Sequence, residues 1–72
     1  EYHIRKGSGL CNKQVQEVKW PPESVIASIQ RKNRLIVPHG STKLQADDML
    51  TVVADADSEL LLNRLFGEDS YI

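Results

Sequence analysis

The sequence predicts an α+β domain: a small, mostly antiparallel sheet of about four strands with two helices on one face. Short runs rich in alternating or β-branched apolar residues fill the middle of the chain. Polar turns of hairpin length separate two of these runs. A leucine-rich segment with helical spacing follows near the end. The expected order is strand, helix, strand, strand, strand, helix, within one domain over residues 1–72.

The first strand is expected over residues 1–5, which alternate loosely before the glycine-containing turn at residues 6–9. A short helix is expected over residues 10–18, because apolar residues recur there at helical spacing among polar ones. Pro21 and Pro22 would end it, since proline lacks the amide hydrogen and disfavours helix in the residue before it. The apolar positions of this helix are Leu10, Val15 and Val18.

The central strands are expected at residues 24–31, 35–38 and 49–54. The first has a period of two, and the third is rich in β-formers. Lys32-Asn33 would form the turn of the hairpin, because asparagine tolerates left-handed backbone. The face of the first strand expected to be apolar carries Val25, Ala27 and Ile29, with Ile26 available for a second apolar contact.

The last helix is expected to begin after Asp55 or Asp57, because acidic residues favour the positive end of the helix dipole. Gly67 is a natural stop. The apolar stripe expected on this helix consists of Leu60, Leu61, Leu65 and Phe66.

Composition narrows the class of function. The chain has nine Lys and Arg residues and ten Asp and Glu residues, with a net charge of −1. It therefore has no excess of basic residues that would indicate a nucleic-acid partner. The single cysteine, Cys11, fits a reducing compartment. A chain of this size buries only about 60% of its unfolded surface, which favours a dimer. Because the chain opens on Glu1 rather than Met, we expect a piece of a longer protein, and no signal peptide or membrane span is evident.

Catalytic and metal chemistry find little support in the sequence. His3, Cys11 and His39 are potential ligands, but none shows the paired spacing that lets one element supply two ligands. Cys11 could equally be a small apolar residue, and His39 a solvated residue of a turn. Asp47 and Asp48 enter a strand side by side, so their carboxylates should diverge and serve the turn. Neither a metal, a cofactor nor an enzymatic reaction is therefore expected.

Three other side chains have open alternatives. Trp20, before the two prolines, could cap the seam between helix and sheet or form an exposed stacking platform. Arg31 and Arg34 flank the hairpin turn. A solvated pair is the default interpretation for them, and contact with an anionic ligand or an acidic partner is the alternative.

In order along the chain, these features resemble the C-terminal domain of the TrkA or RCK family, the regulators of potassium conductance. The family pattern combines a small-residue turn, a short helix ending before proline, a strand with Ile-x-Arg, a Pro-x-Gly-x-Thr-x-Leu loop, an Asp-x-Leu-x-Val strand and a leucine-rich helix. The resemblance covers roughly residues 3–67. Its matching residues are Leu10, Val15, Glu17, Val18, Pro21, Ile29, Arg31, Ile36, Pro38, Gly40, Thr42, Leu44, Asp48, Leu50, Val52, Leu62, Leu65 and Phe66.

The chain departs from the family pattern where glycine is usual and Asn12, Asn33 and Asp47 stand instead. Asparagine and aspartate enter left-handed backbone most readily after glycine, so the turns should survive these changes.

The resemblance implies a dimeric regulatory domain on the cytoplasmic face of a membrane, attached to or associated with a cation channel, antiporter or other transporter. In some members the dimer cleft binds a small effector, of which cyclic di-AMP is the best-known example. The alternative is a ligand-free assembly module. The ligand-binding residues that the resemblance implies are Ile29, Arg31, Leu35, Ile36, Val37, Pro38 and His39.

Overall fold

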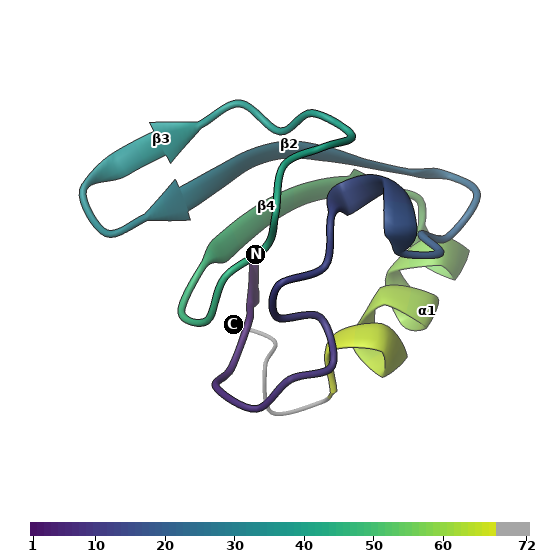
Figure 1. Cartoon of the computed structure of the whole chain (residues 1–72). Helices are drawn as coiled ribbons and strands as arrows, with labels where there is room; N and C mark the ends of the chain where they lie inside the picture. The colour runs from purple at the N-terminus through teal and green to yellow at the C-terminus, as the bar shows by residue number, and fades with distance from the viewer. Residues whose placement is uncertain (68–72) are drawn as a thin grey trace.

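The fold, described over residues 1–67 in a computed structural model, is a four-stranded antiparallel sheet with one α-helix (Figure 1). The strands lie side by side in the order β1-β4-β2-β3. The elements are β1 (Tyr2–His3), a short 3-10 helix η1 (Val15–Glu17), β2 (Ser24–Arg31), β3 (Arg34–Ile36), β4 (Met49–Ala54) and α1 (Ala56–Phe66). The predicted α+β class and antiparallel sheet are confirmed, whereas the prediction of two α-helices is wrong.

The segment predicted as the first helix is a series of turns that contains only η1. Asn12 adopts left-handed backbone with φ 68°, which no continuous helix permits. Gln14 then pairs as an isolated bridge with Lys43, so the backbone combines short turns with hydrogen bonds to another loop instead of continuing as a helix. Leu10 and Val18 are nevertheless buried. The apolar spacing therefore marked buried positions correctly but not the backbone that places them.

Strand β2 contains a bulge that moves its apolar side chains from one side of the sheet to the other. Ile26 pairs with Val52 and Ser28 with Thr51, so Ala27 has no partner on β4. An unpaired residue reverses the alternation of side chains. Ile29 is consequently buried, whereas Val25 is exposed. The prediction that Val25, Ala27 and Ile29 share an apolar face is therefore wrong for Val25, which lies before the bulge, and for Ala27, which lies at the bulge.

The left-handed residues fall close to the predicted positions. Asn12 and Asp47 have φ values of 68° and 71°, which confirms two of the three positions where the family pattern has glycine. In the hairpin turn, however, Lys32 has the positive φ of 55° and Asn33 does not. At Asp47 the chain bends so that Ile4 exchanges two backbone hydrogen bonds with the Asp47–Asp48 turn. This exchange continues the contact of β1 with β4 past His3.

Helix α1 begins and ends as predicted. The Asp55 carboxylate caps it by accepting the Ser58 amide hydrogen at 2.8 Å, and Gly67 follows its last turn with φ 83°. The predicted stripe is partly wrong, because Leu62 and Phe66 are buried while Leu60 and Leu61 point outward. The leucine run surrounds the helix, so spacing alone does not select the buried side.

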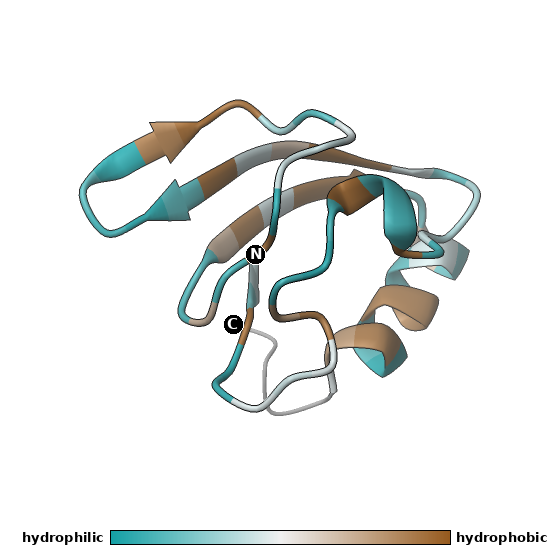
Figure 2. Cartoon of the chain, viewed as in Figure 1, coloured by the Kyte–Doolittle hydropathy of each residue, from teal (hydrophilic) through white to brown (hydrophobic). Residues whose placement is uncertain are grey.

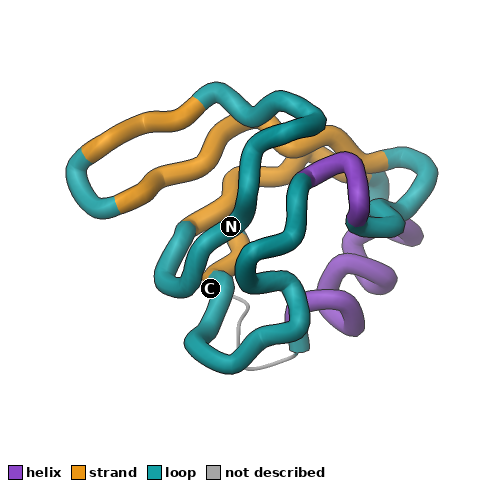
Figure 3. The backbone as a smooth tube through the Cα atoms, viewed as in Figure 1, coloured by secondary structure: helices purple, strands orange, loops and turns teal. Residues whose placement is uncertain are grey.

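The core lies on one side of the sheet, between the strands and the layer formed by α1 and the long loops (Figure 3). Tyr2 stacks on Phe66 with ring centroids 4.8 Å apart, and its hydroxyl donates to Asn63 at 3.2 Å. We call the side of the sheet that faces this core the covered side, and the opposite side of the sheet the open side. The fully or nearly buried apolar residues are Tyr2, Ile4, Leu10, Val18, Ile29, Leu44, Leu50, Leu62 and Phe66.

Candidate functional site

The seven residues proposed from the sequence lie around the β2–β3 hairpin, but on two sides of the sheet. Ile29 is fully buried, and Ile36 pairs with it on the covered side. Leu35 pairs with Gln30, one position along, and therefore faces the open side. Val37 follows at the same parity and is 67% exposed. Strand alternation thus places Leu35 and Val37, rather than Ile29, where a partner or ligand could contact them.

An apolar patch covers part of the open side. Val25 and Val53 face each other across β2 and β4, and the end of β3 continues into the loop with further apolar residues (Figure 2). Each patch residue exposes about two-thirds of its surface. Exposed apolar side chains that gather on one sheet face mark interaction surfaces. We define the open-side patch as Val25, Leu35, Val37 and Val53.

Sequence reasoning missed Val25 and Val53 as surface residues. Val25 has the parity of Ile29, so strict alternation predicts that the two share one apolar face. The available signal was the isoleucine at position 26, which breaks the alternation and is typical of a bulge.

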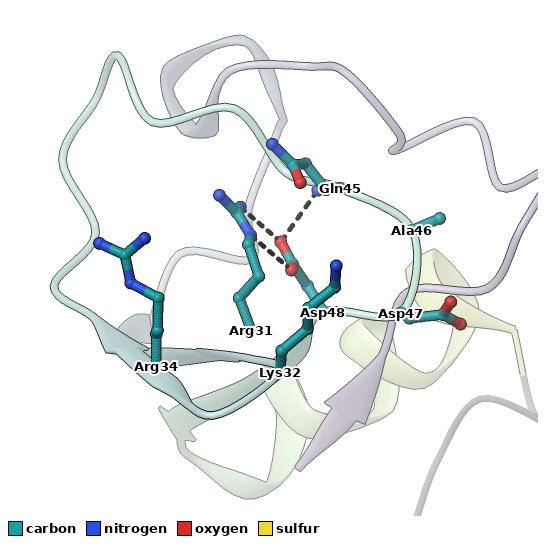
Figure 4. Close-up of a pocket in the computed structure, with 7 residues that line it drawn as sticks. All are labelled: Arg31, Lys32, Arg34, Gln45, Ala46, Asp47 and Asp48. Atoms are coloured by element: carbon teal, nitrogen blue, oxygen red, sulfur yellow. Dashed lines mark hydrogen bonds and ion pairs between the residues drawn. The ribbon is translucent and has the colours of Figure 1, made fainter.

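The default interpretation of Arg31 as a solvated residue is wrong. Its side chain instead binds a buried carboxylate. Its Nε and Nη2 atoms donate to Asp48 Oδ1 and Oδ2 at 2.8 Å each, and Nη2 also donates to the Lys43 carbonyl at 2.9 Å (Figure 4). The Asp48 side chain is 0% exposed. The hydrogen bonds that Arg31 donates to Asp48 raise the pKa of Arg31, and the negative charge of Asp48 adds to this rise, whereas burial opposes it.

The predicted divergence of Asp47 and Asp48 is confirmed. While Asp48 points inward to Arg31, the Asp47 carboxylate lies on the surface, 3.3 Å from His3 Nε2. Asp48 also stabilises the turn itself, since its Oδ2 atom accepts the Gln45 amide hydrogen at 2.9 Å.

A pocket of about 280 Å³ opens beside this ion pair. Arg34 projects alongside Arg31, and Lys32 reaches in from the hairpin turn (Figure 4). Neither Lys32 nor Arg34 forms an ion pair with any residue in 1–67, whereas the Asp48 charge is already compensated. Cations without a partner charge at the border of a pocket favour the binding of an anion there. The lining residues are Arg31, Lys32, Arg34, Gln45, Ala46, Asp47 and Asp48.

The loop after β3 is held in one shape by local hydrogen bonds. The His39 amide donates to Thr42 Oγ1 at 2.9 Å, and the Thr42 amide returns a bond to the His39 carbonyl at 3.1 Å. Gly40 accepts the Gln16 amide hydrogen, and a Cβ at Gly40 would lie 2.9 Å from Gln16 Oε1. A larger residue at this position would therefore require the end of the Gln16 side chain to move. The loop therefore presents Pro38 and His39 at a fixed place beside β3.

The three potential metal ligands are distributed over separate places. His3 lies beside Asp47, Cys11 Sγ contacts the Arg5 carbonyl at 3.5 Å, and His39 is exposed in its loop. Within residues 1–67, His, Cys, Asp and Glu side chains form no group of three that could hold a metal ion. Trp20 is half-buried against Phe66 and donates its indole hydrogen to the Val15 carbonyl at 2.9 Å, as a capping residue would.

The fold is that of a small α+β domain. Its notable surfaces are an open apolar sheet side and a cationic pocket. Within the described part of the chain, no helix is both long enough and apolar enough to cross a membrane.

Comparison with known proteins identifies the family. A sequence model of the TrkA-C domain matches residues 1–67, so the chain belongs to the TrkA-C family of regulatory domains. It is 29% identical over 69 residues to the Trk system potassium uptake protein TrkA homolog 2 of Methanosarcina mazei, covering 96% of this chain and 15% of the relative. It is 31% identical over 67 residues to the K(+)/H(+) antiporter NhaP2 of Shewanella sp. strain ANA-3, covering 93% and 12%.

A solved structure described as an RCK domain with cda has the same fold. Its TM-score is 0.76 at 25% identity, covering 90% of each chain. The chain thus spans nearly all of that solved domain, but less than a fifth of the length of the two transport-related relatives.

Proposed function

We propose that this chain is a ligand-sensing, dimerising regulatory domain of a potassium-type channel, antiporter or other cation transporter, on the cytoplasmic face of the membrane. Membership of the TrkA-C family and the transport systems of the two relatives support this role. The observations that carry the proposal are the open-side patch and the cationic pocket, which lie on opposite sides of the sheet and meet at the β2–β3 hairpin. One surface can bury apolar area against a second copy, and the other can hold an anionic effector.

The dimer would form through the open side. Val25 and Val53 lie at its centre, and Leu35 and Val37 extend the patch toward the hairpin. Burying apolar surface at roughly 25 cal/mol per Å² favours association of such patches. The two-fold axis of such a dimer would pass near Val25 and Val53, so the edge strand β3 and its loop would lie at the flank of the interface.

The effector would be a nucleotide with two negative charges, for which cyclic di-AMP is the candidate. Leu35, Val37 and Pro38 would contact the purine rings, with His39 at the rim. Arg31 donates through Nε and Nη2 to protein acceptors, so the phosphates would instead reach Lys32 in the turn and Arg34 on the covered side, around the edge strand β3. The ligand would act by population shift, favouring one arrangement of the dimer and so one state of the attached transporter.

A thermal-shift titration with cyclic di-AMP, NADH and ATP tests the sensing role. A ligand at a hundred times its dissociation constant stabilises the fold by about 2.7 kcal/mol. We expect a saturable shift for one nucleotide, weakened in Arg34→Ala and Val37→Asp but unchanged in Lys19→Ala. Lys19 is the matched cation, since it lies beside Trp20, away from the hairpin.

Ligand-free assembly is the second candidate, and the aromatic residues favour it. Tyr2 and Trp20 both contact Phe66 on the covered side, so none of the aromatic side chains in residues 1–67 is placed to stack on a base at the open side. Absence of any shift in a sample that is cleanly dimeric would support this candidate. Sedimentation of Val53→Lys, with Ala56→Lys as the exposed control, tests the dimer itself: loss of the dimer in the first variant only is expected.

A further inference from the structure

Helix α1 carries a second apolar surface, on its side away from the sheet. Leu60 and Leu61 expose 64% and 44% of their surfaces, and they lie between two exposed charged residues, Asp57 and Arg64. With 3.6 residues per turn, these four positions form one stripe roughly opposite the buried Leu62. Neither Asp57 nor Arg64 is paired with an opposite charge among residues 1–67.

A hollow of about 460 Å³ borders this stripe. The chain before β2 forms one wall with Trp20, Pro21 and Pro22, Leu61 and Leu65 of α1 form the other, and the cations Lys19 and Arg64 stand at its border. Prolines and a tryptophan held by its own hydrogen bond give this wall a fixed shape. An apolar side chain arriving from outside would find an apolar recess beside Leu61.

The stripe is complementary to itself under a two-fold rotation. When two copies of α1 lie antiparallel and are centred between residues 60 and 61, Asp57 lies opposite the partner's Arg64, and Arg64 lies opposite the partner's Asp57. Leu60 then lies opposite the partner's Leu61, next to the partner's hollow. Isologous pairing of this kind requires each charge to meet its opposite across the axis, and the order acid, two leucines, base satisfies that requirement.

We propose that α1 forms a second, weaker homotypic interface by pairing antiparallel with α1 of another copy of this chain. Each copy places Leu60 in the hollow of the other, and two Asp57–Arg64 ion pairs flank the leucines. The contact is small compared with the roughly 800 Å² per partner of a standard interface, so it links copies weakly on its own. Joined to the open-side interface proposed above, it would connect dimers into larger assemblies through avidity.

The helix interface can be tested separately from the open-side dimer. All chains carry Val53→Lys to remove open-side association, and sedimentation equilibrium is followed together with the fluorescence of Trp20, the only tryptophan. In this Val53→Lys background, Asp57→Arg and Arg64→Asp are made as separate variants, and each places like charges at both ends of the stripe. We expect self-association to weaken roughly tenfold in each, since two exposed ion pairs become two repulsions. Mixing these two variants restores opposite charges at both ends, so heterodimers should form.

Two further variants control for effects of charge on the helix itself. Glu59→Arg makes the same charge change within the same turn but outside the stripe, so it should leave association unchanged. The double variant Asp57→Arg, Arg64→Asp should associate like the parent. On heterodimer formation the emission of Trp20 should shift to shorter wavelength, as water leaves the hollow. If the mixture forms no heterodimer while circular dichroism shows both variants folded, the proposal is wrong, whatever the fate of the open-side dimer.

Discussion

Arg31 at the end of β2 and Asp48 in the turn before β4 form a bidentate ion pair, with both N–O distances at 2.8 Å. The same guanidinium binds the Lys43 carbonyl, and the same carboxylate binds the Gln45 amide. This pair therefore fixes the long loop after β3 against the hairpin and shapes the floor of the cationic pocket.

Removing the arginine should destabilise the domain strongly. Arg31→Met leaves the Asp48 carboxylate buried with its main partner lost, and breaking a buried pair in this way costs about 3–5 kcal/mol. Arg31→Lys keeps the charge but loses the planar two-point geometry, so an intermediate loss is expected. Urea denaturation followed by circular dichroism measures the free energy of unfolding.

Arg34→Met is the matched control for this prediction, because Arg34 has no ion pair in residues 1–67, and it should change stability by less than about 0.5 kcal/mol. The raised pKa belongs to a cation, so the stabilisation that it brings is fully present below the ordinary arginine pKa and is lost only as pH rises above it. The difference between parent and Arg31→Met should accordingly not arise from titration of Arg31 between about pH 6 and 9. An equal effect of both substitutions would contradict a structural role for the pair.

Replacing Lys32 with glycine should stabilise the hairpin. Lys32 holds a φ of 55°, a conformation that costs a side-chain-bearing residue about 1–2 kcal/mol, whereas glycine loses part of this gain through its greater freedom when unfolded. A net gain of about 0.5–1 kcal/mol is expected in thermal unfolding. Asn33→Gly is the opposite case, because Asn33 is not left-handed, and it should destabilise. The prediction fails if the two substitutions act in the same direction.

The sequence predicted the elements whose local signals agreed with their packing. Strand β2 was predicted with its exact bounds because its β-branched run is bordered by turn residues on both sides. Helix α1 was predicted because the capping carboxylate of Asp55 and the terminal Gly67 frame it. The pattern from Pro38 to Leu50 identified the family, and the structure gives some of its residues a local role, as in the hydrogen bonds between His39 and Thr42.

The remaining features depended on contacts that periodicity does not encode. The segment before Pro21 buries residues at helical spacing, yet the bridge of Gln14 to Lys43 makes its backbone irregular. A single unpaired residue, Ala27, decided which valines face outward. Likewise, Arg31 was considered as a ligand contact because its partner Asp48 lies seventeen positions away in the chain.

The N-cap of α1 should be worth about 1 kcal/mol. Asp55→Ala removes the carboxylate that accepts the Ser58 amide hydrogen and leaves that amide without its cap. Glu59→Ala is the control, since it removes one acidic residue from the same first turn without removing a cap. Equal loss of helical circular dichroism in both variants would indicate that charge, rather than the hydrogen bond, sets the start of the helix.

Leu50 and Val53 lie on the same strand but on opposite sides of the sheet, so they separate folding from assembly. Leu50 is 0% exposed and pairs with both Ile29 and Tyr2, and Leu50→Ala should cost about 2–5 kcal/mol at any protein concentration. Val53→Ala removes a side chain that is 65% exposed, so in dilute samples the cost should stay near about 0.5 kcal/mol. If Val53 is buried by a second copy, this cost must grow as protein concentration rises, because association stabilises the folded state by mass action. Chemical denaturation at two concentrations a hundredfold apart measures this difference, and a Val53→Ala cost that does not depend on concentration would contradict an open-side dimer.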